Sequence, residues 1–353
     1  MRSSDAPATP RTARRCPGVV PPFLLDRLAR AGDAALAEPA QRTLTVDRAV
    51  RAVRLTRRPT RPGEPGPSRR VFDAQGRTAL PGVVVREEGA PSRGDDDVDE
   101  AYDGLGATWT LLMDVYGRDS LDGAGSGLDA TVHYGQRYDN AFWDGERMVF
   151  GDGDGIVFRG FTDVPSVIGH ELAHGLVQET ADLVYRGQPG ALNESVSDVV
   201  GALVEQRLRG QDAASASWLI GEGLFLPGVQ GRALRDMAAP GTAYDDPRLG
   251  RDPQPGHMDD YVETDEDDGG VHINSGIPNR AFHLTATALG GSAWERAGQV
   301  WYDTLTGGSL ARDADFAAFA AATAAAAGAR YGAGSPEQEA VRAGWAGVGL
   351  EVR

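Results

Sequence analysis

The sequence predicts an α+β protein of two lobes, a β-rich N-terminal lobe and a mainly α-helical C-terminal lobe, preceded by a short helical segment. Short alternating runs of apolar and polar residues, separated by Gly/Asp turns, lie between about residues 70 and 160 and are typical of strands. Helical patterns dominate from about residue 163 onward. A stretch rich in proline and glycine, residues 57–69, precedes the strands and is typical of an exposed linker.

The segment before this linker contains two helical patterns. The first follows a Pro-Pro pair at 21–22, and the second ends shortly before the linker. Their apolar residues fall on one side of each helix: Leu24, Leu25 and Leu28 in the first, then Leu44, Val46, Ala49, Val50 and Val53 in the second. We therefore expect residues 1–69 to form a small helical unit with its linker.

The remaining elements follow in two blocks. Strands are predicted at "ATVHYG" (130–135), "MVFGDGDG" (148–155) and "IVFRGF" (156–161). Helices are predicted at 163–179, 193–209, 278–289, 292–304, 311–328 and 335–346, the last opening with a Ser cap and a proline in "SPEQE". The two lobes are accordingly placed at residues 70–180 and 181–353.

Composition and charge narrow the class of protein. The chain has 353 residues, 41% of them hydrophobic, and a net charge of −16, which argues against a nucleic-acid partner. One basic region, 48–70, leaves a polyanion contact as a minor alternative. A single cysteine, Cys16, excludes an internal disulfide. We expect no membrane span and no standard signal peptide, which leaves the compartment open between the cytoplasm and a non-standard export route. We also expect a monomer.

The stretch "SVIGHELAHGLVQ" (166–178) carries the first chemical signal. His170 and His174 lie four residues apart, so on a helix both imidazoles share one face and can bind one metal ion. Glu171 projects near that ion without having to bind it, as in hydrolases where a carboxylate takes a proton from a water that the metal activates. This pattern alone also fits a core helix with incidental histidines.

A third donor is found in "ALNESVSDVVG" (191–201). Glu194 lies twenty residues after His174 and can complete a zinc site, which needs three protein ligands and one open position. Asp198, one turn further on the same face, can accept the spare N–H of a ligand histidine and fix its tautomer. The rest of this helix is largely apolar, so carboxylates in it need a partner.

With these residues in place, the chain resembles the thermolysin-like neutral metalloproteases, the gluzincins of family M4. The resemblance runs from about residue 70 to the C-terminus. It is carried by "YDNAFWDGERMVFGDGDG", "HELAHG", "LVYRGQPGALNESVSD", "LRDM" and "DDGGVHINSGIPN", in the family's order. It implies a zinc-dependent endopeptidase of two lobes, with the zinc helix between them.

The resemblance also implies a role for individual residues. His170, His174 and Glu194 would bind zinc, and Glu171 would be the general base. Tyr185 and His272 would donate hydrogen bonds to the oxyanion, with Asp267 orienting His272, while Asp198 would orient a zinc ligand. Substrate contacts are implied for two further groups: Asn140 and Arg235 for the backbone, and Val167, Ile220, Leu224 and Leu234 for the residue after the cut. This aliphatic pocket predicts a preference for Leu, Ile, Val or Phe on the amine side of the cut.

The N-terminal segment is similar to the short propeptides of protealysin-like precursors, a subgroup of this family. Cys16 and "PPFLL" (21–25) carry this resemblance. It implies an autoprocessed precursor whose own segment inhibits it until cleavage between about residues 45 and 80. Cys16 is a candidate zinc ligand in that precursor, although a free apolar cysteine is the favoured interpretation.

Departures from the family pattern affect calcium. Ser166, Ser217, Leu219 and Gly223 stand where the family's double calcium site has acidic ligands, leaving Glu205 and Glu222, so we expect that site to be absent or reduced. Two other functions stay open. One is an inactive, zinc-stabilised protein-binding module of the same fold, and the other is a metal-dependent aminopeptidase, for which no residue that would bind a free amine can be named.

Overall fold

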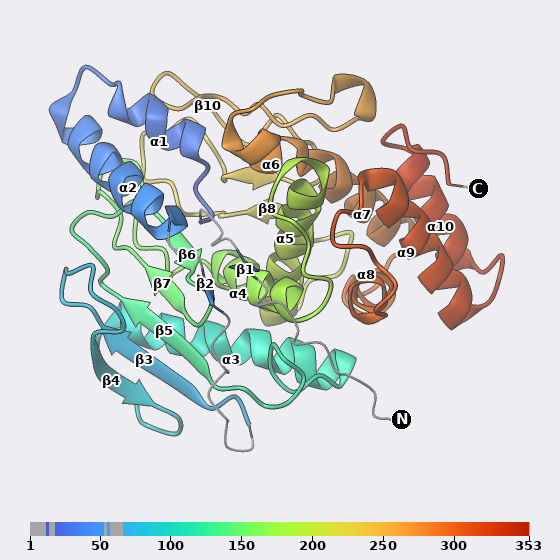
Figure 1. Cartoon of the computed structure of the whole chain (residues 1–353), viewed down its shortest axis with the longest axis horizontal. Helices are drawn as coiled ribbons and strands as arrows, with labels where there is room; N and C mark the ends of the chain where they lie inside the picture. The colour runs from blue at the N-terminus through green and yellow to red at the C-terminus, as the bar shows by residue number, and fades with distance from the viewer. Residues whose placement is uncertain (1–11, 14–17, 53–54, 57–65, 353) are drawn as a thin grey trace, which may run out of the picture.

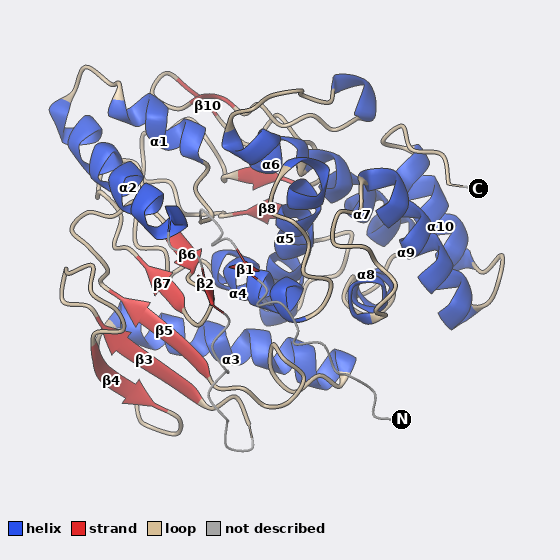
Figure 2. Ribbon diagram, viewed as in Figure 1, coloured by secondary structure: helices blue, strands red, loops and turns tan. Residues whose placement is uncertain are grey.

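The computed structural model describes residues 12–13, 18–52, 55–56 and 66–352. Figure 1 shows the strands of the N-terminal lobe at one side of the molecule and the last helices at the opposite side, and Figure 2 separates the two by colour. The expected fold class, a β-rich lobe followed by a helical lobe and preceded by a short helical segment, is confirmed. No helix in the described ranges is long and apolar enough to span a bilayer.

The N-terminal lobe is built on a five-stranded mixed sheet of order β4-β3-β5-β7-β6. Its central strand, β5, is parallel to both neighbours and buried along its whole length, while the edge strands run antiparallel. The strands are β3 (Arg69–Asp73), β4 (Val83–Glu87), β5 (Leu128–Val132), β6 (Ala141–Trp143) and β7 (Met148–Phe150). The edge strand β6 borders the site described below.

This lobe differs from the prediction in two places. Helix α3 (Asp96–Tyr116) packs against the sheet where only strands were expected. The predicted strand at 156–161 does not form, apart from an isolated bridge at Phe158. The reason is local, because the Asp154 carboxylate accepts the backbone N–H groups of residues 156, 157 and 158 at 2.7–3.0 Å and so removes the donors that a strand would use.

The C-terminal lobe begins where two helices cross. Helix α4 (Pro165–Glu179) packs on α5 (Gly187–Arg209), and the contact is closest at Gly169 and Gly201. A Cβ on Gly201 would lie 2.3 Å from the carbonyl oxygen of Ser166, so the backbones approach more closely than any side chain permits. This crossing sets the separation of the side chains that project from the two helices.

The other elements of this lobe follow α5 in the chain. Its helices are α6 (Asp267–Asn274), α7 (Gly276–Leu289), α8 (Ala297–Thr306), α9 (Phe316–Tyr331) and α10 (Pro336–Ala346), with a 3-10 turn, η1 (Met258–Asp260). Two small antiparallel pairs are formed by β8 (Leu219–Ile220) with β9 (Arg235–Asp236) and by β10 (Asp245–Asp246) with β11 (Gly250–Arg251). Ser335 caps α10 by accepting the N–H of Gln338, as predicted.

The N-terminal segment folds onto the lobes. Helices α1 (Pro22–Ala29) and α2 (Ala34–Ala52) form a pair at the upper left in Figure 1, and β1 (Thr12–Ala13) pairs with β2 (Leu55–Thr56). The predicted apolar side of α1, made by Leu24, Leu25 and Leu28, is buried. Cys16, Val53 and linker residues 57–65 lie outside the described residues.

Candidate active site and metal centre

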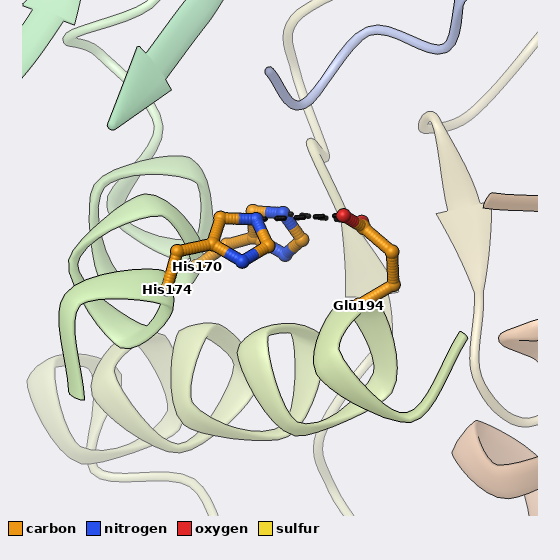
Figure 3. Close-up of side chains that lie close together, drawn as sticks. All are labelled: His170, His174 and Glu194. Carbon is orange, nitrogen blue, oxygen red and sulfur yellow. Dashed lines mark ion pairs between the residues drawn. The ribbon is translucent and has the colours of Figure 1, made fainter. Parts of the chain in front are cut away.

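Two histidines and a carboxylate converge where α4 crosses α5. His170 and His174 project from α4 and Glu194 from α5, as Figure 3 shows, and their candidate ligand atoms all lie within 4.8 Å of one another. The Nε2 atoms of His170 and His174 are each 3.5 Å from a Glu194 oxygen. All three side chains are at most 2% exposed.

These three residues fit a zinc ion. His170 Nε2, His174 Nε2 and Glu194 Oε2 are buried and have no hydrogen-bond partner among the described residues. Burying polar atoms without a partner costs free energy, so the convergence of these three atoms indicates that they bind one ion together. Two imidazoles and one carboxylate, with a fourth position open, are the donor set of a catalytic zinc site.

The opposite nitrogen of each imidazole is held by α5. His170 Nδ1 lies 2.7 Å from Asp198 Oδ1, and His174 Nδ1 lies 2.8 Å from Asn193 Oδ1 and 3.1 Å from Ser197 Oγ. These contacts leave Nε2 of each ring turned toward Glu194. Burial lowers the pKa of both imidazoles to about 4, which keeps them in the neutral form that binds metal.

Asp198 joins the two lobes at this point. It accepts two hydrogen bonds of 2.8 Å from Arg235 and one of 2.8 Å from Asn279, in addition to its contact with His170. Burial by itself would raise the pKa of Asp198, but the charge of Arg235 overcomes this and holds the pKa below its ordinary value. Asp198 therefore stays ionised while completely buried.

Glu171 lies beside this group with one oxygen unused. Its Oε2 accepts the backbone N–H of Trp143 at 2.8 Å, whereas Oε1 is buried and has no hydrogen-bond partner in the described parts of the chain. Burial, together with the nearby charge of Glu194, raises the pKa of Glu171 well above its ordinary value. A buried carboxyl with a free oxygen at the sheet edge is placed to exchange a proton with a bound molecule.

Tyr185 and His272 approach the Glu194 carboxylate from the helical lobe. The Tyr185 hydroxyl donates to Glu194 Oε1, and His272 Nε2 is 3.5 Å from Glu194 Oε2. Asp267 holds the other side of the His272 ring, with 2.6 Å between Oδ1 and Nδ1, and also accepts the backbone N–H of His272. Burial disfavours the charged imidazole, but Asp267 and Glu194 outweigh it and raise the pKa of His272.

The residues implied in substrate contact bind the N-terminal segment. Asn140 accepts the N–H of Val20 at 3.0 Å and donates to its carbonyl at 3.4 Å, and Arg235 donates to the carbonyl of Val19 at 3.0 Å. The four aliphatic residues of the expected pocket are all buried, and Ile220 pairs directly with Arg235 across β8 and β9: Val167, Ile220, Leu224 and Leu234.

The region of the expected calcium site contains an arginine. Arg209 Nη2 lies 2.7 Å from Glu205 Oε1, and its Nη1 lies 3.3 Å from Glu222 Oε2. Ser217 also donates to Glu222. The two remaining acidic residues therefore share a guanidinium as their countercharge.

Sequence reasoning missed three polar residues of the site. Asn193 and Ser197 contact His174, and Asn279 donates to Asp198, yet short polar side chains of this kind are common in helices. A usable signal was present for two of them. Asn193 directly precedes Glu194 and Ser197 follows it by three residues, and both are polar residues within one largely apolar helix.

Comparisons with known proteins agree with this geometry. The family model for the thermolysin metallopeptidase catalytic domain matches residues 43–178, and that for the thermolysin metallopeptidase alpha-helical domain matches residues 181–350. The extracellular metalloprotease of Pectobacterium carotovorum subsp. carotovorum is 48% identical over 337 residues, which cover 95% of this chain and 96% of that protein. Protease PrtS of Photorhabdus sp. (strain Az29) is 54% identical over 257 residues, covering 72% of this chain and 69% of that protein.

A solved structure extends the likeness to the N-terminal segment. The precursor of protealysin, a metalloproteinase from Serratia proteamaculans, superposes with a TM-score of 0.87 at 50% identity. The match covers 96% of this chain and 100% of that one. The chain belongs to the thermolysin family of metallopeptidases, and it is a zinc metalloendopeptidase.

Proposed function

We propose that this endopeptidase cuts peptide bonds on the amine side of hydrophobic residues and is made as a precursor that its own N-terminal segment inhibits. The observation that carries the proposal is a set of four buried atoms on α4 and α5 that have no hydrogen-bond partner among the described residues: His170 Nε2, His174 Nε2, Glu194 Oε2 and Glu171 Oε1. The first three atoms can bind a zinc ion, and Glu171 Oε1 can accept a proton and transfer it.

Each residue then has a defined task. Zinc held by His170, His174 and Glu194 would polarise the attacking water and the substrate carbonyl. Glu171 takes a proton from that water and passes it to the leaving amine. Tyr185 and His272 donate hydrogen bonds to the carbonyl oxygen as negative charge develops on it, and the loss of one such donor costs on the order of 10²–10³ in rate.

Specificity follows from the aliphatic residues near Arg235. Arg235 and Asn140 hold the backbone of the residues that follow the cut, which directs the first of these side chains toward the pocket formed by Val167, Ile220, Leu224 and Leu234. Digestion of a peptide library should give cuts before Leu, Ile, Val or Phe. Cuts mainly before charged residues would contradict this assignment.

The N-terminal segment acts as an inhibitor in the precursor. Residues 1–69 form the propeptide and linker, 70–180 the β-rich catalytic lobe with the zinc helix, and 181–353 the helical lobe. Support comes from the contacts of Val19 and Val20 with Asn140 and Arg235, which occupy the groups that would bind substrate. Removal of the segment by cleavage between about residues 45 and 80 frees them.

Calcium is not needed at the site beside α5. The guanidinium of Arg209, shared by Glu205 and Glu222, supplies the positive charge that a cation would otherwise provide. With serine at position 166, too few charged oxygens remain for a calcium ion, which takes six to eight oxygen ligands.

The test compares the full chain with Glu171→Gln, and with Glu179→Gln as the matched control on the same helix. Each protein receives zinc and is followed by intact mass, together with an internally quenched peptide whose amino terminus is blocked. The unmutated chain and Glu179→Gln should lose the N-terminal segment and gain chelator-sensitive activity, while Glu171→Gln should do neither.

The outcomes separate the rival functions. Zinc binding without cleavage in any of the three proteins would favour the inactive binding module. Cleavage of an unblocked peptide but not of the blocked one would favour an aminopeptidase. Equal activity of Glu171→Gln and the unmutated chain would remove Glu171 from the role of base.

A further inference from the structure

The N-terminal segment enters the active site next to strand β6. Val19 donates its N–H to the carbonyl of Ala141 at 3.0 Å, and Val20 donates its N–H to Asn140 Oδ1 at 3.0 Å. Both valines are completely buried. The path of the backbone is narrow at Gly18, where a Cβ would lie 2.4 Å from the Ala141 carbonyl oxygen and 2.7 Å from Asn140 Oδ1.

The orientation of one peptide group is informative. The N–H of Val19 points to the carbonyl of Ala141, on the strand whose Trp143 N–H binds Glu171, while the carbonyl of Val19 accepts from Arg235. In a trans peptide the preceding carbonyl points away from the N–H, so the Gly18 carbonyl faces away from the Ala141 carbonyl. The Gly18–Val19 bond thus directly precedes the two residues that Arg235 and Asn140 hold.

A leaving amine must be within reach of the group that protonates it. Under the proposed function, Arg235 and Asn140 bind the residues that follow a cut, and their contacts with Val19 and Val20 place these two residues in that register, with Val19 as the leaving amine. The segment therefore lies in the direction of a substrate.

We propose that the Gly18–Val19 peptide bond is the first substrate of this site and is cut within the same molecule before the linker is cleaved. The proposal rests on the proposed function. In this step a water oxygen bonds to the Gly18 carbonyl carbon and the C–N bond breaks. One water proton passes through Glu171 to the Val19 nitrogen, which leaves a Gly18 carboxylate and a Val19 amine.

The cut alone does not release the inhibitor. Helices α1 and α2 remain attached to Val19, and α2 keeps its own contacts with the lobe: Asp47 accepts from Tyr138 and from Asn140, and Thr43 Oγ accepts the N–H of Asp139. The first product is therefore a chain that begins at Val19 and still covers part of the site.

The experiment follows the freshly prepared full chain after zinc addition by intact mass and N-terminal sequencing, over a series of dilutions. Gly18→Ala is the test variant because its methyl group collides with backbone atoms. Gly32→Ala, in the turn between α1 and α2, is the matched control because nothing lies within 4 Å of its Cβ. A quenched peptide is added in parallel to report on the active site.

A chain that begins at Val19 should be the earliest product, at a rate that does not depend on protein concentration. Gly32→Ala should give the same product, and Gly18→Ala should not. A readout independent of cleavage uses the same two changes in the Glu171→Gln background. There, hydrogen exchange at the Val19 and Val20 amides should become faster with Gly18→Ala only.

Two results would overturn the proposal in distinguishable ways. If the quenched peptide is cleaved while the first product begins elsewhere, the Gly18–Val19 bond is not the substrate and the protease function stands. If neither the peptide nor the precursor is cleaved, the proposed function fails as well. Unchanged exchange in Gly18→Ala would show that the segment does not depend on the narrow path beside Ala141.

Discussion

Asp198→Asn tests how strongly the buried charges support the site. The substitution keeps the shape of the side chain but removes the charge that faces Arg235, which is 1% exposed, and replaces one acceptor oxygen with a donor. Breaking a buried pair from one side costs about 3–5 kcal/mol of unfolding free energy. Because His170 Nδ1 also depends on this carboxylate, zinc affinity should fall by about 10- to 100-fold.

The measurement uses the Glu171→Gln background, so that no chain is lost to self-cleavage. Urea unfolding with zinc chelated gives the stability term, and competition with a colorimetric chelator gives the zinc affinity. Asp163→Asn is the control, since Asp163 pairs with Arg159 at the exposed surface and its loss should cost under about 1 kcal/mol. A loss of under about 1 kcal/mol in Asp198→Asn as well would refute the claim that Arg235 needs a buried countercharge.

Three further predictions concern the frame around the site. Gly201→Ala should lower the free energy of unfolding in urea by about 1–3 kcal/mol, because its methyl group meets the Ser166 carbonyl. An unchanged unfolding midpoint would mean that helices α4 and α5 can move apart enough to accommodate the methyl group without cost. Burial raises the pKa of Asp139, so the folded precursor holds this proton more tightly than the unfolded chain, and the stability linked to it is lost as pH rises. Asp139→Asn should therefore become the more stable chain as the pH increases from about 4 to 8, and a constant difference in thermal midpoint would contradict this. Calcium should leave the thermal midpoint unchanged in the parent and raise it only in Arg209→Ala, where Glu205 has lost its countercharge; stabilisation of the parent would argue for an intact calcium site.

The sequence predicted those parts of the fold that are determined by residues close together in the chain. Helix α4 begins at a proline and carries two histidines one turn apart, so both its start and its candidate metal-binding pair are visible in the sequence. Helix α10 shows its Ser cap and proline equally clearly. In each case, local chemistry decides the structure.

The parts that were missed depend on distant contacts. Helix α3 contains Gly104 and Gly106, which look like strand-breaking turns, but a Cβ at either would lie 2.3 Å from Ile168 or Arg69. Helix α5 starts at Gly187, earlier than predicted, and its first turns include Gly190, where a Cβ would lie 2.5 Å from Val271. Such glycines are required by neighbours far away in the chain, which no local pattern reveals.

The site shows the same division. The spacing of His170, His174 and Glu194 indicated a metal centre, and the structure brings the three together. The bridging position of Asp198 between His170, Arg235 and Asn279 arises only when the lobes meet, so the sequence indicated one of its partners and not the others.

The contact between Val19 and Arg235 joins positions 216 residues apart, and this has a consequence for the order of events during synthesis. A ribosome makes the chain from its N-terminus, so residues 18–52 exist before Glu194 supplies the third ligand and before Arg235 completes the cleft. Under the proposed function, the inhibitory segment is therefore synthesised before the site that it blocks. Each newly completed chain would then begin with its substrate-binding groups already occupied by Val19 and Val20.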